Sequence, residues 1–141
     1  MSRSPLETLL KLRKQEMERA EQVFETALAN EEQAREAVGA AEDRILQEQQ
    51  VASSSDCDDT LVEAFGNWLP TGREAVRQAR RQEQQLVIDT AVAQAALVAA
   101  RTAYKTVETL SAQRKEQARQ KMLKDEQNQM DDLRRPLHSP L

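Results

Sequence analysis

Aromatic residues, cysteine and histidine are scarce in this chain of 141 residues, which has one Trp, one Tyr, two Phe, one Cys and one His. So few large side chains give little capacity to fill a three-dimensional core. The lone Cys57 cannot form an internal disulfide, and the chain begins with a charged amphipathic pattern instead of an apolar signal core. We therefore expect a cytosolic protein without a globular core.

Glycine and proline are also few, with three and four residues, whereas charged residues make up 31% of the chain. Ala, Glu, Gln, Arg and Leu dominate, which is the composition of long helices and coiled coils. No stretch approaches the roughly 20 apolar residues that a membrane-spanning helix requires. We therefore expect membrane contact only through partners.

Residues that carry out catalysis or bind metals are missing as well. The single His138 lies in a Pro-flanked tail, and Cys57 lies among acidic residues, which disfavour its reactive thiolate form. The acids around Cys57 lack the spaced ligands and the terminal Glu of a calcium loop. We therefore predict no enzyme activity, no metal and no cofactor.

The net charge of −4 hides a division between the two halves of the chain. Residues 1–50 carry 7 Lys/Arg against 11 Asp/Glu, and residues 71–135 carry 13 against 9. Opposite charges suit two segments that pack side by side in antiparallel fashion, although exposed pairs contribute only ~0–1 kcal/mol each.

A heptad-like pattern predicts a first helix over about residues 5–52. Ser4 precedes Pro5 and Glu7, which is the arrangement of a capped helix start. Alternating steps of four and three residues then mark one stripe, 11 of whose 14 members are apolar, and this period keeps a stripe facing a partner helix. The stripe consists of Leu6, Leu10, Arg13, Met17, Ala20, Phe24, Ala27, Glu31, Ala34, Val38, Ala41, Ile45, Glu48 and Ala52.

A connector over 53–71 should follow, with a short helix at about 60–69 that Pro70 stops. Thr71 and Glu74 would then cap a second helix over about 72–135, before a flexible tail at 136–141. The stripe of that helix consists of Val76, Ala79, Glu83, Leu86, Thr90, Ala93, Leu97, Ala100, Tyr104 and Val107. The predicted fold is a single all-α domain over 1–141, a long antiparallel coiled-coil hairpin with a short helical connector at its tip.

The second helix is longer than the first, so its end should lack an intrachain partner. If Ala52 lies near Gly72, Leu6 lies near residue 118, because both helices rise equally per residue. Residues ~119–135 would then project beyond Ser4, where the apolar stripe dissolves. This extension is partly basic, which suits an acidic surface, a protein partner or simply solvent. We do not expect nucleic-acid binding, since no aromatic residue is interleaved for stacking.

The connector holds the aromatic residues Phe65 and Trp68 together with Leu69. They could anchor a partner at the tip, since aromatic residues concentrate binding energy in interfaces. Packing against the hairpin itself is the favoured interpretation.

Two segments carry a family resemblance: 5–13, Pro-Leu-Glu-Thr-Leu-Leu-Lys-Leu-Arg, and 114–133, where Arg-Lys-Glu leads to Asp-Glu-Gln-Asn-Gln-Met-Asp-Asp-Leu. The chain resembles the FliJ family of flagellar type III export proteins over nearly its full length. The resemblance implies a non-enzymatic stalk, cytoplasmic and peripheral at the inner face of the membrane. It also implies that the stalk binds the export ATPase hexamer and the export gate in the membrane, and helps to recycle export chaperones.

In this family the end carrying both termini enters the ATPase ring. The resemblance thus implies ring contacts by Leu6, Leu9, Leu10, Arg13, Arg114, Lys115, Arg119, Lys121, Lys124, Glu126, Gln127 and Leu133. Two other interpretations stay open: the homologous stalk protein of an injectisome, and a generic coiled-coil scaffold that dimerises through its stripe.

Overall fold

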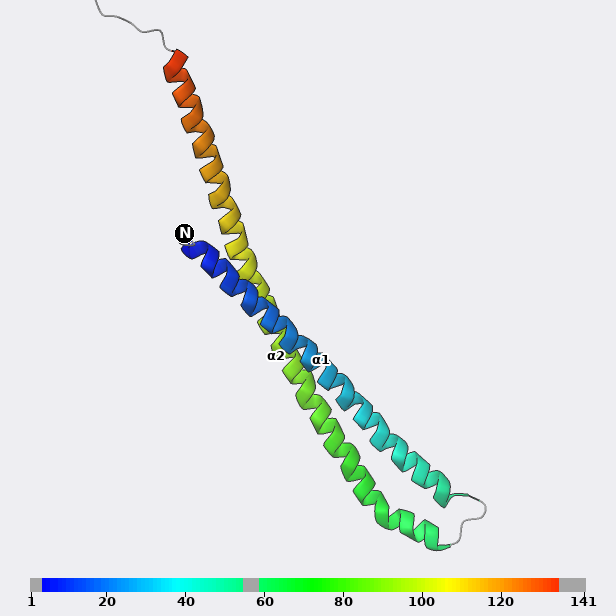
Figure 1. The fold of residues 1–141 in the computed structure, drawn as a ribbon. Helices are drawn as coiled ribbons and strands as arrows, with labels where there is room; N and C mark the ends of the chain where they lie inside the picture. The colour runs from blue at the N-terminus through cyan, green and yellow to red at the C-terminus, as the bar shows by residue number, and fades with distance from the viewer. Residues whose placement is uncertain (1–3, 55–58, 135–141) are drawn as a thin grey trace, which may run out of the picture. The chain divides into compact units, whose positions relative to one another are not determined.

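Two helices account for nearly all of the chain. The computed structural model describes residues 4–54 and 59–134, which form α1 (Pro5–Ala52) and α2 (Asp59–Arg134) (Figure 1). No strand occurs among these residues, and α1 packs against α2. The predicted all-α helical hairpin is therefore confirmed. Cys57, His138 and the tail at 136–141 lie outside the described residues.

The hairpin divides into two compact units, to each of which α1 and α2 both contribute a segment. One unit combines the residues up to Met17 with those from Ala100 onward, and the other spans Glu18–Ala99. Below, these are called the terminal unit and the tip unit. Because both are built from the same two helices, we keep the prediction of a single hairpin domain.

The start of α1 has the predicted cap. The backbone N–H of Glu7 donates to Ser4 Oγ at 3.2 Å, and the N–H of Thr8 donates to the Ser4 carbonyl, also at 3.2 Å. Pro5 occupies the first helical position, where it has no amide hydrogen to leave unsatisfied. At the other end, the N–H of Ser53 donates to the Gln49 carbonyl at 2.9 Å.

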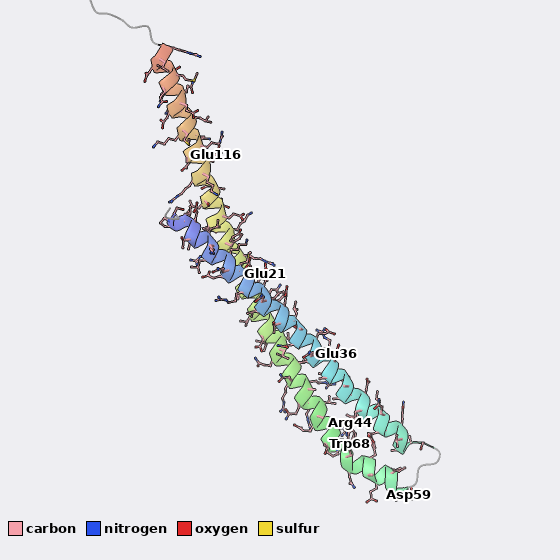
Figure 2. The ribbon with its side chains drawn as sticks, viewed as in Figure 1. Glu21, Glu36, Arg44, Asp59, Trp68 and Glu116 are labelled. Carbon is pink, nitrogen blue, oxygen red and sulfur yellow. The ribbon has the colours of Figure 1, made fainter. Side chains whose placement is uncertain are left out.

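The predicted boundary at Pro70 is wrong, because α2 already begins at Asp59 and continues through Pro70 without a break. A proline in a helix interior removes one backbone hydrogen bond and strains the preceding turn, which bends the helix without necessarily ending it. Figure 2 shows α2 changing direction next to the labelled Trp68. The predicted connector helix is therefore the first part of α2, and Thr71 and Glu74 are internal residues instead of a cap.

The predicted stripes form the contact between the helices. In α1, all stripe residues except Glu48 are at least partly buried, and in α2 all of them are. The buried residues are Ala34, Gly72, Val76, Thr90, Ala93 and Leu97 in the tip unit, and Val107 and Ser111 in the terminal unit. The buried side chains are small on average, so the helices approach closely and bury modest apolar area.

The predicted register is wrong by about one heptad. Placing Ala52 at Gly72 would set Ala27 opposite Leu97, but the Thr90 hydroxyl donates to the Ala27 carbonyl at 3.2 Å. The same hydroxyl lies 2.9 Å from the Leu86 carbonyl. A shift of seven residues leaves the same stripe facing the partner helix, because the stripe repeats every seven residues. The stripe residues were therefore predicted correctly although the register was not.

The expectation that no stretch is apolar enough to span a membrane is also wrong. α2 contains an 18-residue window that passes this test by length and composition, and only 17% of the window is buried. The stretch 86–103 carries only two charged residues, Asp89 and Arg101. Ala and Val supply its apolar character without forming an uninterrupted run.

Candidate functional site

The C-terminal part of α2 is a helix in which no residue is buried. Every residue from Ala112 to Arg134 is exposed, whereas Ser111, immediately before, is 6% exposed. This segment, called the extension, belongs to the terminal unit and is the end of α2 in Figure 1. It begins about one heptad earlier than predicted, which follows from the register shift.

The first part of the extension flanks a cleft at the start of α1. The cleft has a volume of about 290 Å³ and is lined by Ser4–Glu7 on α1 and by residues of α2 from Ser111 to Ala118. Three predicted ring-contact residues, Leu6, Arg114 and Lys115, are among its lining residues. The structure therefore brings the two ends of the predicted site together here.

The remaining predicted ring-contact residues on α1 are less accessible. Leu9 and Leu10 are half-buried, like Leu6. Arg13 is also half-buried, and its guanidinium lies 2.9 Å from the Glu16 carboxylate. A partner would therefore meet the edges of these side chains instead of their full surface.

Cations on the extension differ in whether they are already paired. Arg119 forms an ion pair with Glu116 at 2.6 Å. This hydrogen bond holds the pKa of the Glu116 carboxyl below its ordinary value and raises the pKa of Arg119. Lys121 and Lys124 have no ion pair within residues 4–54 and 59–134. The same is true of Arg114 and Lys115, so these four cations are available to an acidic partner.

Apolar residues of the extension were overlooked in the sequence. Met122, Leu123 and Met130 are 65%, 51% and 54% exposed, and the predicted contact residue Leu133 is 86% exposed. Met122 and Leu133 are eleven residues apart, or three helical turns, so they share one side. Following the stripe at 122, 126, 129 and 133 instead of 121, 125 and 128 would have found Met122, but not Leu123 or Met130. The other predicted residues, Glu126 and Gln127, are exposed on the same segment.

The aromatic residues at the tip pack against α1. The rings of Phe65 and Trp68 lie 6.2 Å apart between centroids, and the Arg44 guanidinium lies 5.3 Å from the Trp68 ring centroid. A Cβ added at the buried Gly72 would lie 2.7 Å from the Trp68 ring, so glycine leaves room for the indole. Phe65, Trp68 and Leu69 are all half-buried. Their role as a partner anchor stays a prediction.

A second groove, not foreseen from the sequence, lies in the tip unit. Its volume is about 500 Å³, and Ile45, Leu46 and Val76 provide its apolar lining. The arginines at its margin are Arg73, Arg77 and Arg80. Arg80 crosses to Glu42 on α1 at 2.8 Å, which joins the two helices across this face.

Clusters of metal-binding or reactive side chains are few in the part of the chain that the structure describes. There, no three His, Cys, Asp or Glu side chains are grouped so that they could hold a metal ion. In the terminal unit, hydrogen bonds from Lys105 and Tyr104 hold the pKa of the half-buried Glu108 carboxyl below its ordinary value. Lys105 Nζ lies 3.1 Å from this carboxylate, so Glu108 already has an ion pair on its own helix.

Comparison with known proteins identifies one family. The family described as flagellar FliJ protein matches residues 1–139. No curated protein and no solved structure matches the chain. The match covers both helices and the extension.

Proposed function

Because the chain belongs to the FliJ family of flagellar proteins, we propose that it is a non-enzymatic stalk of the flagellar type III export apparatus. The family establishes a role connected with flagellar export, and so a cytoplasmic or membrane-proximal place of action. The finer proposal is that the stalk binds the export ATPase ring and couples it to the export gate. Contact with export chaperones belongs to the same proposal.

One observation supports the ring contact above all: the extension is a helix that nothing in the described chain covers. It carries exposed apolar side chains, such as Met122 and Leu133, beside the cations Lys121 and Lys124. A helix that is exposed on all sides gains little from packing, so it is suited to a channel whose walls are supplied by another molecule.

The test is the rate of ATP hydrolysis by the purified flagellar export ATPase with and without this protein. We expect the full chain to increase the rate and to co-purify with the ATPase. A chain that ends at Gln113 should give no increase while its remaining residues stay helical, because the buried stripe residues all precede that point. Absence of stimulation by the full chain would contradict the proposed role.

Two matched double variants test whether stimulation of the ATPase depends on the net charge of the chain or on charges at the extension. Lys121→Gln with Lys124→Gln removes two cations of the extension that have no ion pair among the described residues, and should weaken stimulation. Arg73→Gln with Arg81→Gln removes the same charge from the tip unit and should leave stimulation unchanged. Equal effects of both pairs would point to net charge instead of a site on the extension.

The rival interpretation, a dimeric scaffold, is tested by measuring the oligomeric state. Analytical ultracentrifugation of the 16.0 kDa chain should give a monomer, because the stripes of α1 and α2 already face each other within one molecule. A stable dimer that forms through these stripes would contradict the self-paired hairpin.

A further inference from the structure

The side of α2 that faces away from α1 in the tip unit is apolar. Val87, Ile88 and Val92 are 44%, 57% and 64% exposed. Alanines that are also exposed lie among them on the same side of the helix. We call this surface the outer face, and it consists of Val87, Ile88, Ala91, Val92, Ala95 and Ala99. The proposed ring contact on the extension makes no use of it.

The same stretch is apolar on its inner side as well. Ala93 and Leu97 are buried against α1, at 7% and 4% exposure. The helix is therefore apolar around most of its circumference, which explains why it contains a window long and apolar enough to cross a membrane. A helix of this composition normally lies in a protein interior or in contact with lipid. Here only 17% of the window is buried.

Arginines extend the outer face toward the start of α2. Steps of four and three residues lead from Arg73 through Arg77, Arg80 and Gln84 to Val87, so these residues share one side of the helix. Arg77 and Arg80 are paired with carboxylates, at 3.0 and 2.8 Å. Arg73 is exposed and has no ion pair within residues 4–54 and 59–134. The same is true of Arg81 nearby.

The opposite side of the tip unit is acidic. On α1, exposed carboxylates repeat at heptad spacing on the side away from the stripe, and one of them, Glu36, is labelled in Figure 2. The set consists of Glu18, Glu25, Glu32, Glu36 and Asp43. The tip unit is thus two-sided. The outside of α1 carries acids, and the outside of α2 carries apolar and basic residues, among which the carboxylate of Glu74 is paired with Arg77.

We infer that the outer face of α2, together with Arg73 and Arg81, binds an anionic lipid surface. The apolar residues enter the boundary between headgroups and acyl chains, and the arginines contact the phosphates beside them. The acids of α1 are then turned away from the lipid. The repulsion between these acids and the anionic lipid is largely screened. A helix is about 10 Å across, which is close to the Debye length of about 10 Å at 0.1 M salt.

The composition of the outer face favours lipid over a second copy of the chain. Two copies joined in parallel would set each arginine against its counterpart. In an antiparallel pair centred on the outer face, the arginines would meet Thr102, Thr106 and Thr109, which carry no carboxylate to receive them. An anionic lipid surface supplies negative charge at every position, without a defined register.

The test is flotation of the purified full-length chain with vesicles. One set contains phosphatidylcholine alone, and in the other one lipid in three is phosphatidylglycerol. We expect flotation with the anionic vesicles, weakened by added salt, and little with the neutral ones. Equal flotation with both sets, or none with the anionic set, would overturn the inference.

Two double variants assign the contact to the outer face. Arg73→Gln with Arg81→Gln should lower partitioning about 25-fold, since each arginine near an anionic surface contributes about fivefold. Ile88→Gln with Val92→Gln should lower it about tenfold or more, because apolar area is no longer transferred from water. All four side chains are exposed, so helicity should be unchanged in circular dichroism.

Matched changes on α1 provide the control. Val23→Gln with Leu28→Gln alters two side chains that are 55% and 45% exposed in the same unit, and should leave partitioning unchanged. Equal loss in this control and in the Ile88/Val92 variant would overturn the inference. A dimer in ultracentrifugation that Ile88→Gln with Val92→Gln abolishes would overturn it too, because the face would then be an interface between copies. ATPase stimulation in these variants reports separately on the stalk function.

Discussion

α2 contains two stretches with the same backbone conformation and different surroundings. Between Val76 and Ser111, a residue on every turn is buried or half-buried, whereas from Ala112 to Arg134 every residue is exposed. The first stretch is held as a helix by tertiary packing. The second has only local support, such as the ion pair between Glu116 and Arg119. The comparison teaches that a helix can continue well beyond its packing stripe, and that such a continuation is free to receive a partner.

Truncating one leucine in each stretch should give the largest difference in the free energy of unfolding. Leu97→Ala should lower the free energy of unfolding by about 2–3 kcal/mol, near the lower end for a buried leucine, because the two-helix contact is open at its sides. Leu123→Ala should change it by less than about 0.5 kcal/mol, since that side chain is 51% exposed. Urea unfolding followed by circular dichroism measures both. Equal losses would mean that the extension is packed in solution.

The tip provides a second contrast with the extension. Trp68→Ala should lower the free energy of unfolding by more than ~1 kcal/mol, because the ring packs on Arg44 and against Gly72. Met122→Ala should leave stability unchanged, since this side chain is 65% exposed. Thermal unfolding of both variants makes the comparison. An unchanged midpoint for Trp68→Ala would assign the ring to a partner instead of to the hairpin.

Two glycines sharpen the contrast between packed and open positions. A Cβ at Gly39 meets nothing within 4 Å, so Gly39→Ala should stabilise the chain by roughly 0.5–1 kcal/mol through helix propensity. At Gly72 the added Cβ would lie 2.7 Å from the Trp68 ring. The ring must then shift from its present position, so Gly72→Ala should lose that gain or destabilise. If both variants are equally stabilised, the indole is not held in this position.

The sequence predicted the parts of the fold that depend on local pattern. The cap at Ser4 follows from residue types at fixed spacing, and the stripes of both helices follow from the heptad period. The register could not be predicted in the same way, because a shift by one heptad leaves an identical stripe. The contact between Thr90 and the Ala27 carbonyl, which distinguishes the two registers, joins residues 63 apart in sequence.

The helix boundary predicted at Pro70 was wrong for a different reason. By local preference this proline ends a helix, yet the segment before it stays helical because Phe65 and Trp68 pack against α1. Tertiary packing overrides the local preference there. The exposed extension was predicted in outline, because it follows from unequal helix lengths. Its apolar residues Met122 and Met130 were missed, because they lie beside the stripe that was followed and not on it.

The smallest expected effect is that of pH on the carboxylates that provide the extension with local support. The Arg119 hydrogen bond holds the pKa of Glu116 below its ordinary value, so the contribution to stability is present above that value and is lost as pH falls through the lowered pKa. Because the pair is fully exposed, acidification should fray the extension slightly and leave the packed stretch intact. Carboxyl chemical shifts in NMR should give a lower pKa for Glu116 in the full chain than in the Arg119→Gln variant. Identical values would mean that the extension has no lasting ion pair, and that a partner alone keeps it helical.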